Sequence, residues 1–238
     1  MSDRLELLKG FKDLKLGSVL NLLSDVLVIA SFLPMLLAMP RVMWRMSREE
    51  APRSLREVLA LLAPSIISIA TLILAALIMG IAALYLWYRA SDTFRRYDEA
   101  KFGLGRIGAS LSLTGLSILV ISLVATLFWV LSSLLTSGRL IEGVALGSVT
   151  TLLAIAGVVL GVLIYVIGWI LYGVMVMRLS EIPSVSQDFK YAGILMIASI
   201  VLSMLGSFVV VGALVEIASL IMIIVYSDAA IKLLSSPQ

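Results

Sequence analysis

The sequence predicts an all-α protein, a polytopic transmembrane helical bundle that forms one domain. Its composition gives the first indication, because 61% of the 238 residues are hydrophobic, whereas soluble domains contain about 45–50%. The spacing of charges gives the second. Three long stretches carry no charged residue: Glu57 to Arg89, Arg106 to Arg139 and Glu142 to Arg178. Each exceeds the about 20 apolar residues that a transmembrane helix needs. A helix also satisfies its own backbone hydrogen bonds in lipid.

Six spans account for the apolar stretches, two of which are interrupted only by Asp25 and by Glu216. We expect the spans near residues 16–39, 58–87, 108–135, 148–177, 191–208 and 213–231. The last two can be one helix or a hairpin. One helix over 191–227 would be about 55 Å long, and Gly206 and Gly212 favour a turn near its middle. We therefore favour the hairpin.

The N-terminal residues 1–15 precede the first span and are predicted to form an interfacial amphipathic segment. Leu7, Phe11 and Leu14 lie on one helical face, with charged residues elsewhere. This pattern is typical of a helix that lies in the membrane surface. Residues 16–234 then form the single transmembrane domain.

The fourth span begins in the glycine-rich stretch "GVALGSVTTLLAIAGVVLG". A phosphate-binding loop needs a lysine after its glycines and a strand before them, and the sequence offers neither. The small residues instead recur at heptad spacing: Gly143, Gly147, Thr150, Ala154, Gly157, Gly161 and Gly168. Small residues allow transmembrane helices to approach closely. This helix-packing seam predicts packing within the bundle or, alternatively, a dimerisation face.

The distribution of Lys and Arg predicts that both termini lie inside the cell. With six spans, this orientation places twelve basic residues on the inner side and six on the outer side, as the positive-inside rule requires. A weak repeat agrees with it, because the odd spans each open with a phenylalanine, a basic residue and then a glycine. These phenylalanines are Phe11, Phe102 and Phe189. Any membrane entry from a basic surface can have this composition.

The chain contains no Cys and no His, which removes disulfides, iron–sulfur clusters and ordinary zinc sites. It also removes the usual general base. Intramembrane hydrolases need a pair of aspartates, a Ser–His dyad or a metal site, and we expect none of these here, nor a phosphotransfer motif. We therefore expect no catalytic residues, no metal, no cofactor and no enzymatic activity. The absence of Cys also fits a thermophile, in which thermolabile residues are fewer.

Charged residues inside a membrane are candidates for function. Asp25 lies near the middle of the first span, one helical turn after Asn21. We place Glu216 near the outer surface and expect no pairing with Asp25. Asn21, Asp25 and Glu216 form the candidate intramembrane polar site. It is either a proton or cation site, or a polar contact that holds the first helix to its neighbours.

The second loop is basic and aromatic, which favours contact with the anionic headgroups of membrane lipids. The residues predicted to make this contact are Arg89, Arg95, Arg96 and Lys101. The simpler interpretation is that this loop is a solvent-exposed surface whose basic residues follow the positive-inside rule. We expect no nucleic acid to bind here.

Three stretches resemble an archaeal family of multi-span membrane proteins that is known only as a domain of unknown function. They are "FGLGRIGASLSLTGLSILVI", "ILYGVMVMRLSE" and "FKYAGILMIASIVLSMLGSFVVVGALVEIAS". The resemblance covers about residues 85–234. It implies a cell (plasma) membrane location and brings no activity or functional residues with it.

Two functions remain open from the sequence. We favour a non-enzymatic structural or accessory subunit of a membrane assembly, either a homo-oligomer or a complex with other membrane subunits. The alternative is a small permease or channel for an ion or small solute. Asp25 and the weak repeat support this alternative, because internal repeats are common in transporters.

Overall fold

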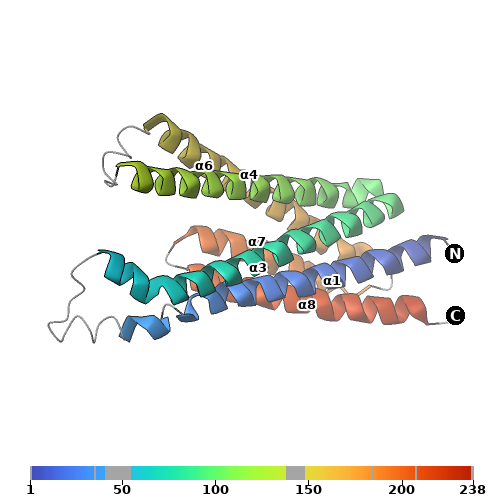
Figure 1. Ribbon diagram of the computed structural model, residues 1–238. Coiled ribbons are helices and arrows are strands. Elements are labelled where there is room, and N and C mark those ends of the chain that lie inside the picture. The colour runs from blue at the N-terminus through green and yellow to red at the C-terminus, as the bar shows by residue number, and fades with distance from the viewer. Residues whose placement is uncertain are drawn as a thin grey trace.

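The computed structural model describes residues 2–34, 36–40, 55–137, 148–183, 185–206 and 208–236. In these residues the chain is helical and contains no strand (Figure 1). The elements are α1 (Ser2–Ser31), α3 (Leu55–Tyr97), α4 (Glu99–Ser137), α6 (Ser148–Arg178), the 3-10 helix η1 (Leu179–Glu181), α7 (Phe189–Met204) and α8 (Val209–Ser235). The predicted all-α class is confirmed.

Five of these helices are long and apolar enough to cross a membrane. Their apolar parts are Arg4–Pro40, Pro64–Tyr97, Glu99–Thr126, Leu152–Glu181 and Val210–Ser235. The sixth helix, α7, has 16 residues and is therefore about 24 Å long, against a hydrocarbon core of about 30 Å. The chain is thus a multi-pass membrane protein in which α7 is the short helix.

The N-terminal residues differ from the expectation of a separate surface segment. They form the first turns of α1, which is continuous from Ser2 to Ser31. Leu7, Phe11 and Leu14 are 6%, 0% and 0% exposed, in the core of the bundle. The apolar face predicted to lie on lipid is thus covered by protein, because the other helices extend as far as this end of α1.

The helices form a closed ring in the described part of the chain. Each helix packs against its predecessor and successor in the chain, and α8 packs against α1. Both termini lie at one end of the ring (Figure 1), which we call the terminal end. The α3–α4 junction at Asp98 and η1 lie there too. The opposite end, where α7 turns into α8, is the distal end.

The stretch from 191 to 231 folds as a hairpin. Helix α7 ends at Met204, α8 begins at Val209, and Gly206 between them has a φ of 61°. Glycine adopts this left-handed conformation without the steric cost that other residues meet. The turn therefore lies where the glycines indicate it.

Aromatic side chains fill the terminal half of the ring in two layers. The outer layer joins Phe11 to Phe94 and to Phe189, with ring centroids 5.0 and 5.8 Å apart. Phe102 completes this layer against Phe94, so the three phenylalanines of the weak repeat are buried together. The inner layer stacks Trp87 on Tyr172 at 4.7 Å, with Trp169 beside them. These layers close the terminal half.

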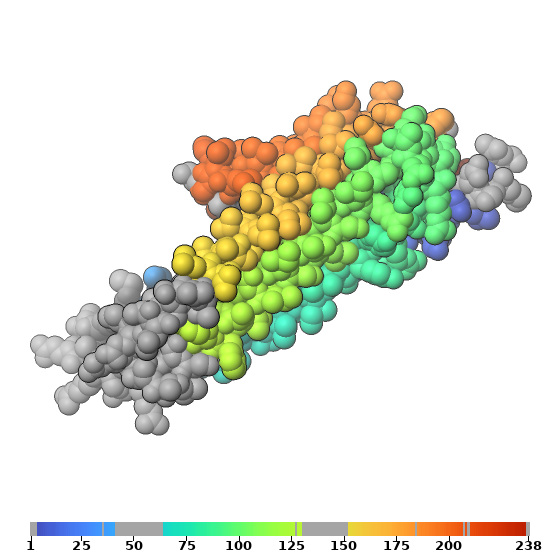
Figure 2. Space-filling model, turned by 90° about the horizontal axis from the view of Figure 1, so that it is seen from above, coloured from blue at the N-terminus to red at the C-terminus, as the bar shows by residue number. Residues whose placement is uncertain are grey.

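The distal half is less tightly packed. Toward this end α4 and α6 stay paired but diverge from α1, α3 and α8 (Figure 1). Figure 2 shows α6 beside α4 and separated from the turn between α7 and α8. Large apolar side chains are exposed on several faces of both helices, including Ile121, Val124 and Phe128 of α4 and Leu152 and Leu153 of α6. The ring is therefore closed at the terminal end and loosens toward the distal end.

Candidate functional site

The inward face of α1 changes from apolar to polar halfway along the helix. Leu7, Phe11 and Leu14 point into the aromatic core. Continuing at the same spacing, Ser18 and Asn21 are 0% and 7% exposed. On this face, small and amide side chains thus replace large apolar ones where α1 enters the middle of the membrane. The candidate site lies where the inward face of α1 becomes polar.

Asn21 contacts Glu216 of α8, since its Nδ2 donates a hydrogen bond to Glu216 Oε1 at 3.5 Å. The expectation that Glu216 would lie apart from the first-span site is wrong. Helix α8 begins at Val209, which puts Glu216 two turns into the helix instead of at its start. The antiparallel packing of α1 and α8 then brings it to Asn21.

The depth of the site follows from a second link between α1 and α8. Lys15 Nζ lies 2.6 Å from Asp228 Oδ1 near the terminal end. Asp25 is ten residues beyond Lys15, and Glu216 is twelve residues before Asp228. At 1.5 Å per residue, both carboxyl groups lie about 15–18 Å deeper than this ion pair. That is close to the centre of a hydrocarbon core about 30 Å thick.

Asp25 shares this environment with Glu216 and with Tyr165 of α6. The two carboxyl groups interact electrostatically, and Tyr165 interacts with both. Asp25 Oδ2 is buried and has no hydrogen-bond partner among the described residues. We call Asn21, Asp25, Glu216 and Tyr165 the carboxyl site. Three helices therefore contribute to it: α1, α6 and α8.

Basic residues lie elsewhere. In the described part of the chain, neither Asp25 nor Glu216 takes part in an ion pair, and the ion pairs that are present lie near the terminal end. Charged side chains at the centre of a bilayer normally pair with one another or line a water-filled path. Two acidic groups without a basic partner can be neutralised only by protons or by a bound cation.

Neighbouring contacts hold the carboxyl site in place. Ser24 Oγ donates to Ala76 O of α3 at 2.8 Å, which fixes the rotation of α1. One turn toward the terminal end, Trp87 Nε1 donates to Ser18 Oγ at 3.3 Å. The inner aromatic layer therefore lies directly beneath the site.

Sequence reasoning missed Tyr165, and the spacing of the small residues gave no signal for it. The seam continues from Gly161 through Ile164 to Gly168, and Tyr165 is the residue after Ile164. Its ring packs on Trp169 with centroids 5.6 Å apart. Its nearness to Asp25 and Glu216 depends on contacts between helices, which the spacing of residues along α6 does not encode.

The seam itself lies between α6 and α4 of the same chain. A Cβ on Gly161 would be 2.9 Å from Leu119 N and 3.0 Å from Gly115 O, and one on Gly168 would be 2.7 Å from Gly108 O. Gly157 faces the side chain of Ser122, and Ala154 is half-buried. Gly143, Gly147 and the side chain of Thr150 lie outside the described residues. The glycines of α4 match those of α6, so the two backbones approach closely.

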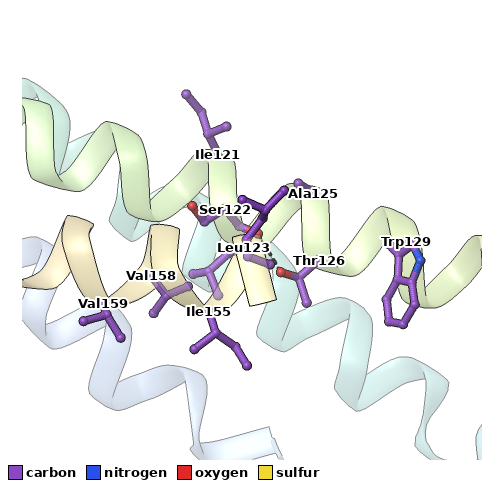
Figure 3. Close-up of a pocket in the computed structure, with 11 residues that line it drawn as sticks. Ile121, Ser122, Leu123, Ala125, Thr126, Trp129, Ile155, Val158 and Val159 are labelled. Carbon is purple, nitrogen blue, oxygen red and sulfur yellow. Dashed lines mark hydrogen bonds between the residues drawn. The ribbon is translucent and has the colours of Figure 1, made fainter. Parts of the chain in front are cut away.

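Distally, the α4–α6 pair carries an apolar groove of about 530 Å³. Figure 3 shows Ser122, Thr126 and Trp129 of α4 with Ile155 and Val158 of α6 along it. Thr126 donates its hydroxyl hydrogen to Ser122 O. None of the described residues that line the groove has an ionisable side chain, so these residues give it an apolar surface.

The predicted lipid-contacting residues are all engaged with carboxylates. Arg89 reaches Asp13 of α1 at 3.3 Å, and Lys101 reaches Glu181 of η1 at 3.6 Å. Arg95 and Arg96 pair within one turn, with Glu99 and Asp92. Arg89 and Lys101 therefore connect elements at the terminal end. Arg95 and Arg96 remain at the surface beside Arg106.

The chain belongs to the family described as "Protein of unknown function (DUF973)", whose model matches residues 7–237. This match confirms the resemblance to a family without an assigned function. It also includes most of the first 85 residues, in which the sequence showed no resemblance. No curated protein matches the chain, and no solved structure matches it.

Proposed function

We propose that the protein is a small permease for protons or another small cation, with Asp25 and Glu216 as the ion-binding groups. The observation that supports this most is the convergence of two carboxyl groups at mid-depth without a basic partner. Each charge at the centre of a membrane helix costs about 2.5–3.5 kcal/mol on insertion scales. A structural contact needs only one neutral polar pair, so a second acidic group is unexplained unless the site takes up a cation.

The packing on either side of the carboxyl site also favours transport. Toward the terminal end, Trp87, Trp169 and Tyr172 are each 1% exposed and separate the site from the ion pairs. Toward the distal end, α4 and α6 diverge from the remaining helices (Figure 1). A permease needs a central site that is closed on one side at a time. This conformation closes the terminal side.

Proton or cation flux in proteoliposomes tests the proposal. The full chain should dissipate an imposed pH or sodium gradient faster than empty liposomes. Asp25→Asn and Glu216→Gln should each abolish this flux, because neither amide can release a proton or carry the charge that holds a cation. Glu181→Gln is the matched control, since Glu181 is 50% exposed at the terminal end. Equal flux for the wild type and both site variants would contradict the proposal.

A structural or accessory subunit is the second candidate. It is supported by the exposed apolar faces of α4 and α6 in the distal half, which another membrane subunit or a second copy could cover. Both candidates are non-enzymatic, and a chain without Cys or His lacks the common nucleophile–base pairs. Purification in a mild detergent with mass measurement distinguishes them. A subunit should retain a stoichiometric partner, and a flux that Asp25→Asn abolishes would favour the permease.

A further inference from the structure

The surface at the α3–α4 junction contains a charged hollow that the carboxyl site does not use. Its volume is about 430 Å³, and five charged side chains line it: Asp92, Arg95, Arg96, Glu99 and Arg106. We propose that this hollow binds the phosphate of an anionic lipid headgroup. The charges, the shape and the membrane depth of the hollow support this assignment, which does not depend on the proposed permease function.

The junction brings the charged residues together. Helix α3 ends at Tyr97 and α4 begins at Glu99, so the chain reverses around Asp98. Asp98 Oδ1 accepts a hydrogen bond from Lys101 N at 3.2 Å, as a residue that caps a helix start does. One turn of α3 and the first turns of α4 therefore face each other. Basic groups distant along the two helices meet on one face.

The ion pairs orient the three guanidinium groups but leave them in excess. Arg96 Nη2 lies 3.0 Å from Asp92 Oδ2, and Arg106 Nη1 lies 3.2 Å from Asp92 Oδ1. Arg95 pairs with Glu99 at 2.6 Å. Three positive and two negative groups leave one net positive charge. A lipid phosphodiester carries a single negative charge, and guanidinium groups bind phosphate oxygens with paired hydrogen bonds.

Gly103 of α4 leaves open space beside Glu99, one of the residues that line the hollow. Gly103 lies between Glu99 and Arg106 on one face of α4 by helical spacing. A Cβ placed there would have only Glu99 Cγ within 4 Å, at 3.9 Å. Space for a phosphate group therefore remains between the charged side chains.

The surroundings select a lipid over free phosphate. Arg106 also donates to Tyr88 Oη, at 3.0 Å from Nη2, and tyrosine is enriched at the membrane–water interface. Deeper in the membrane, Tyr85 of α3 and Ile107 of α4 are 55% and 52% exposed. A ligand with its phosphate in the hollow would thus lay its acyl chains along apolar side chains. Only an amphiphile can contact both the charged hollow and the apolar side chains below it.

Native mass spectrometry of the full chain tests the proposal, with dioleoyl phosphatidylglycerol and dioleoyl phosphatidylcholine added in equal amounts. The wild type should retain phosphatidylglycerol preferentially. Arg96→Gln/Arg106→Gln should weaken that retention by about tenfold or more, since charge-assisted hydrogen bonds are lost. Lys9→Gln/Lys12→Gln is the control, because it removes the same charge from exposed positions outside the hollow. Equal losses in both double variants would show non-specific surface attraction and overturn the proposal.

Gly103→Leu keeps every charge and places a bulky side chain beside Glu99 at the edge of the hollow, so it remains informative if the double arginine variant fails to fold. It should also lose the preference for phosphatidylglycerol. A Gly103→Leu protein that retains the lipid like the wild type would overturn the proposal. In a last experiment, inorganic phosphate is added as a competitor, and at millimolar concentration it should not displace the bound lipid. Displacement by inorganic phosphate would assign the hollow to a free anion and overturn the lipid assignment.

Discussion

At the scale of single residues, the carboxyl site differs from an ordinary polar contact between helices. Asn21 and Glu216 make one hydrogen bond, which would be enough to link α1 to α8. Asp25 adds a second acidic group with a buried oxygen that lacks a hydrogen-bond partner among the described residues. Proteins retain such unfavourable groups where function requires them, and substitutions at these positions often make the protein more stable.

Replacing Asp25 by Asn should therefore leave the fold intact and raise its stability. The amide removes a group that costs about 2.5–3.5 kcal/mol in its charged form and can donate a hydrogen bond to Glu216. We expect the thermal midpoint in detergent to rise or remain unchanged. Asn21→Leu is the contrasting variant, because it leaves Glu216 without its donor and should lower the midpoint. A marked loss of stability in Asp25→Asn would mean that the charged form supports the fold.

At the scale of elements, the pairing of α4 with α6 is the closest helix contact that the glycines describe. The backbones meet at Gly161 against Gly115 and at Gly168 against Gly108. Without side chains between them, van der Waals contacts between the backbones hold the pair, which is the main attraction between helices in lipid. The pair can thus diverge from the other helices at the distal end without separating.

A leucine at Gly161 or at Gly168 should separate these helices. Each Cβ would meet the backbone of α4 within about 3 Å, and overpacking of this kind costs typically about 1–3 kcal/mol. Val159→Leu is the control, because Val159 is 53% exposed and can enlarge into lipid. Thermal unfolding in detergent checks the expectation. If all three variants unfolded at the same temperature, the close contact would not contribute to stability.

At the scale of the whole molecule, the ring has two unlike ends. The terminal end combines two aromatic layers with ion pairs between α1 and α8 and between α1 and α3. The distal end lacks comparable aromatic packing in the described residues, and α4 and α6 diverge there (Figure 1). Opening the carboxyl site toward the terminal end would require α1 to separate from α8.

A crosslink across the terminal end should therefore stop transport. With Lys15→Cys and Asp228→Cys, a short bis-maleimide would tie α1 to α8 at the position of their ion pair. The crosslinked protein should lose cation flux, whereas the same variant before crosslinking should retain most of it. Asp228→Cys/Lys232→Cys is the control, since these residues lie one turn apart on α8. Undiminished flux after complete crosslinking of α1 to α8 would show that this end does not open.

The orientation of the ring in the membrane is a separate prediction. Both termini should lie inside the cell, because the basic residues concentrate at the terminal end. The chain has no native Cys, so single cysteines can be labelled without background. Cysteines at the exposed positions Ala100 and Gln187 should be protected from an impermeant maleimide in intact cells, whereas one at Leu205 should react. Reaction of the first two and protection of the third would reverse the orientation.

The class of the protein and most of its helices follow from the amino-acid sequence alone, because both depend on local properties. A charge-free apolar stretch of about 30 residues crosses lipid as a helix, since it is far longer than a barrel strand and a helix satisfies its own backbone hydrogen bonds. The turn at Gly206 and the heptad of small residues were equally visible. Each of these features is set by residues within one helix or one turn.

Which helix faces meet depends on how the helices pack in three dimensions. Asn21 and Glu216 are 195 positions apart, and their contact depends on the ring closing between α1 and α8. A periodic pattern marks a face of a helix but does not identify what covers it. For that reason the pattern of Leu7, Phe11 and Leu14 predicts a lipid-facing surface, whereas other helices of the same chain cover it. Contacts between distant helices follow from the packing of all six, which no single stretch of sequence encodes.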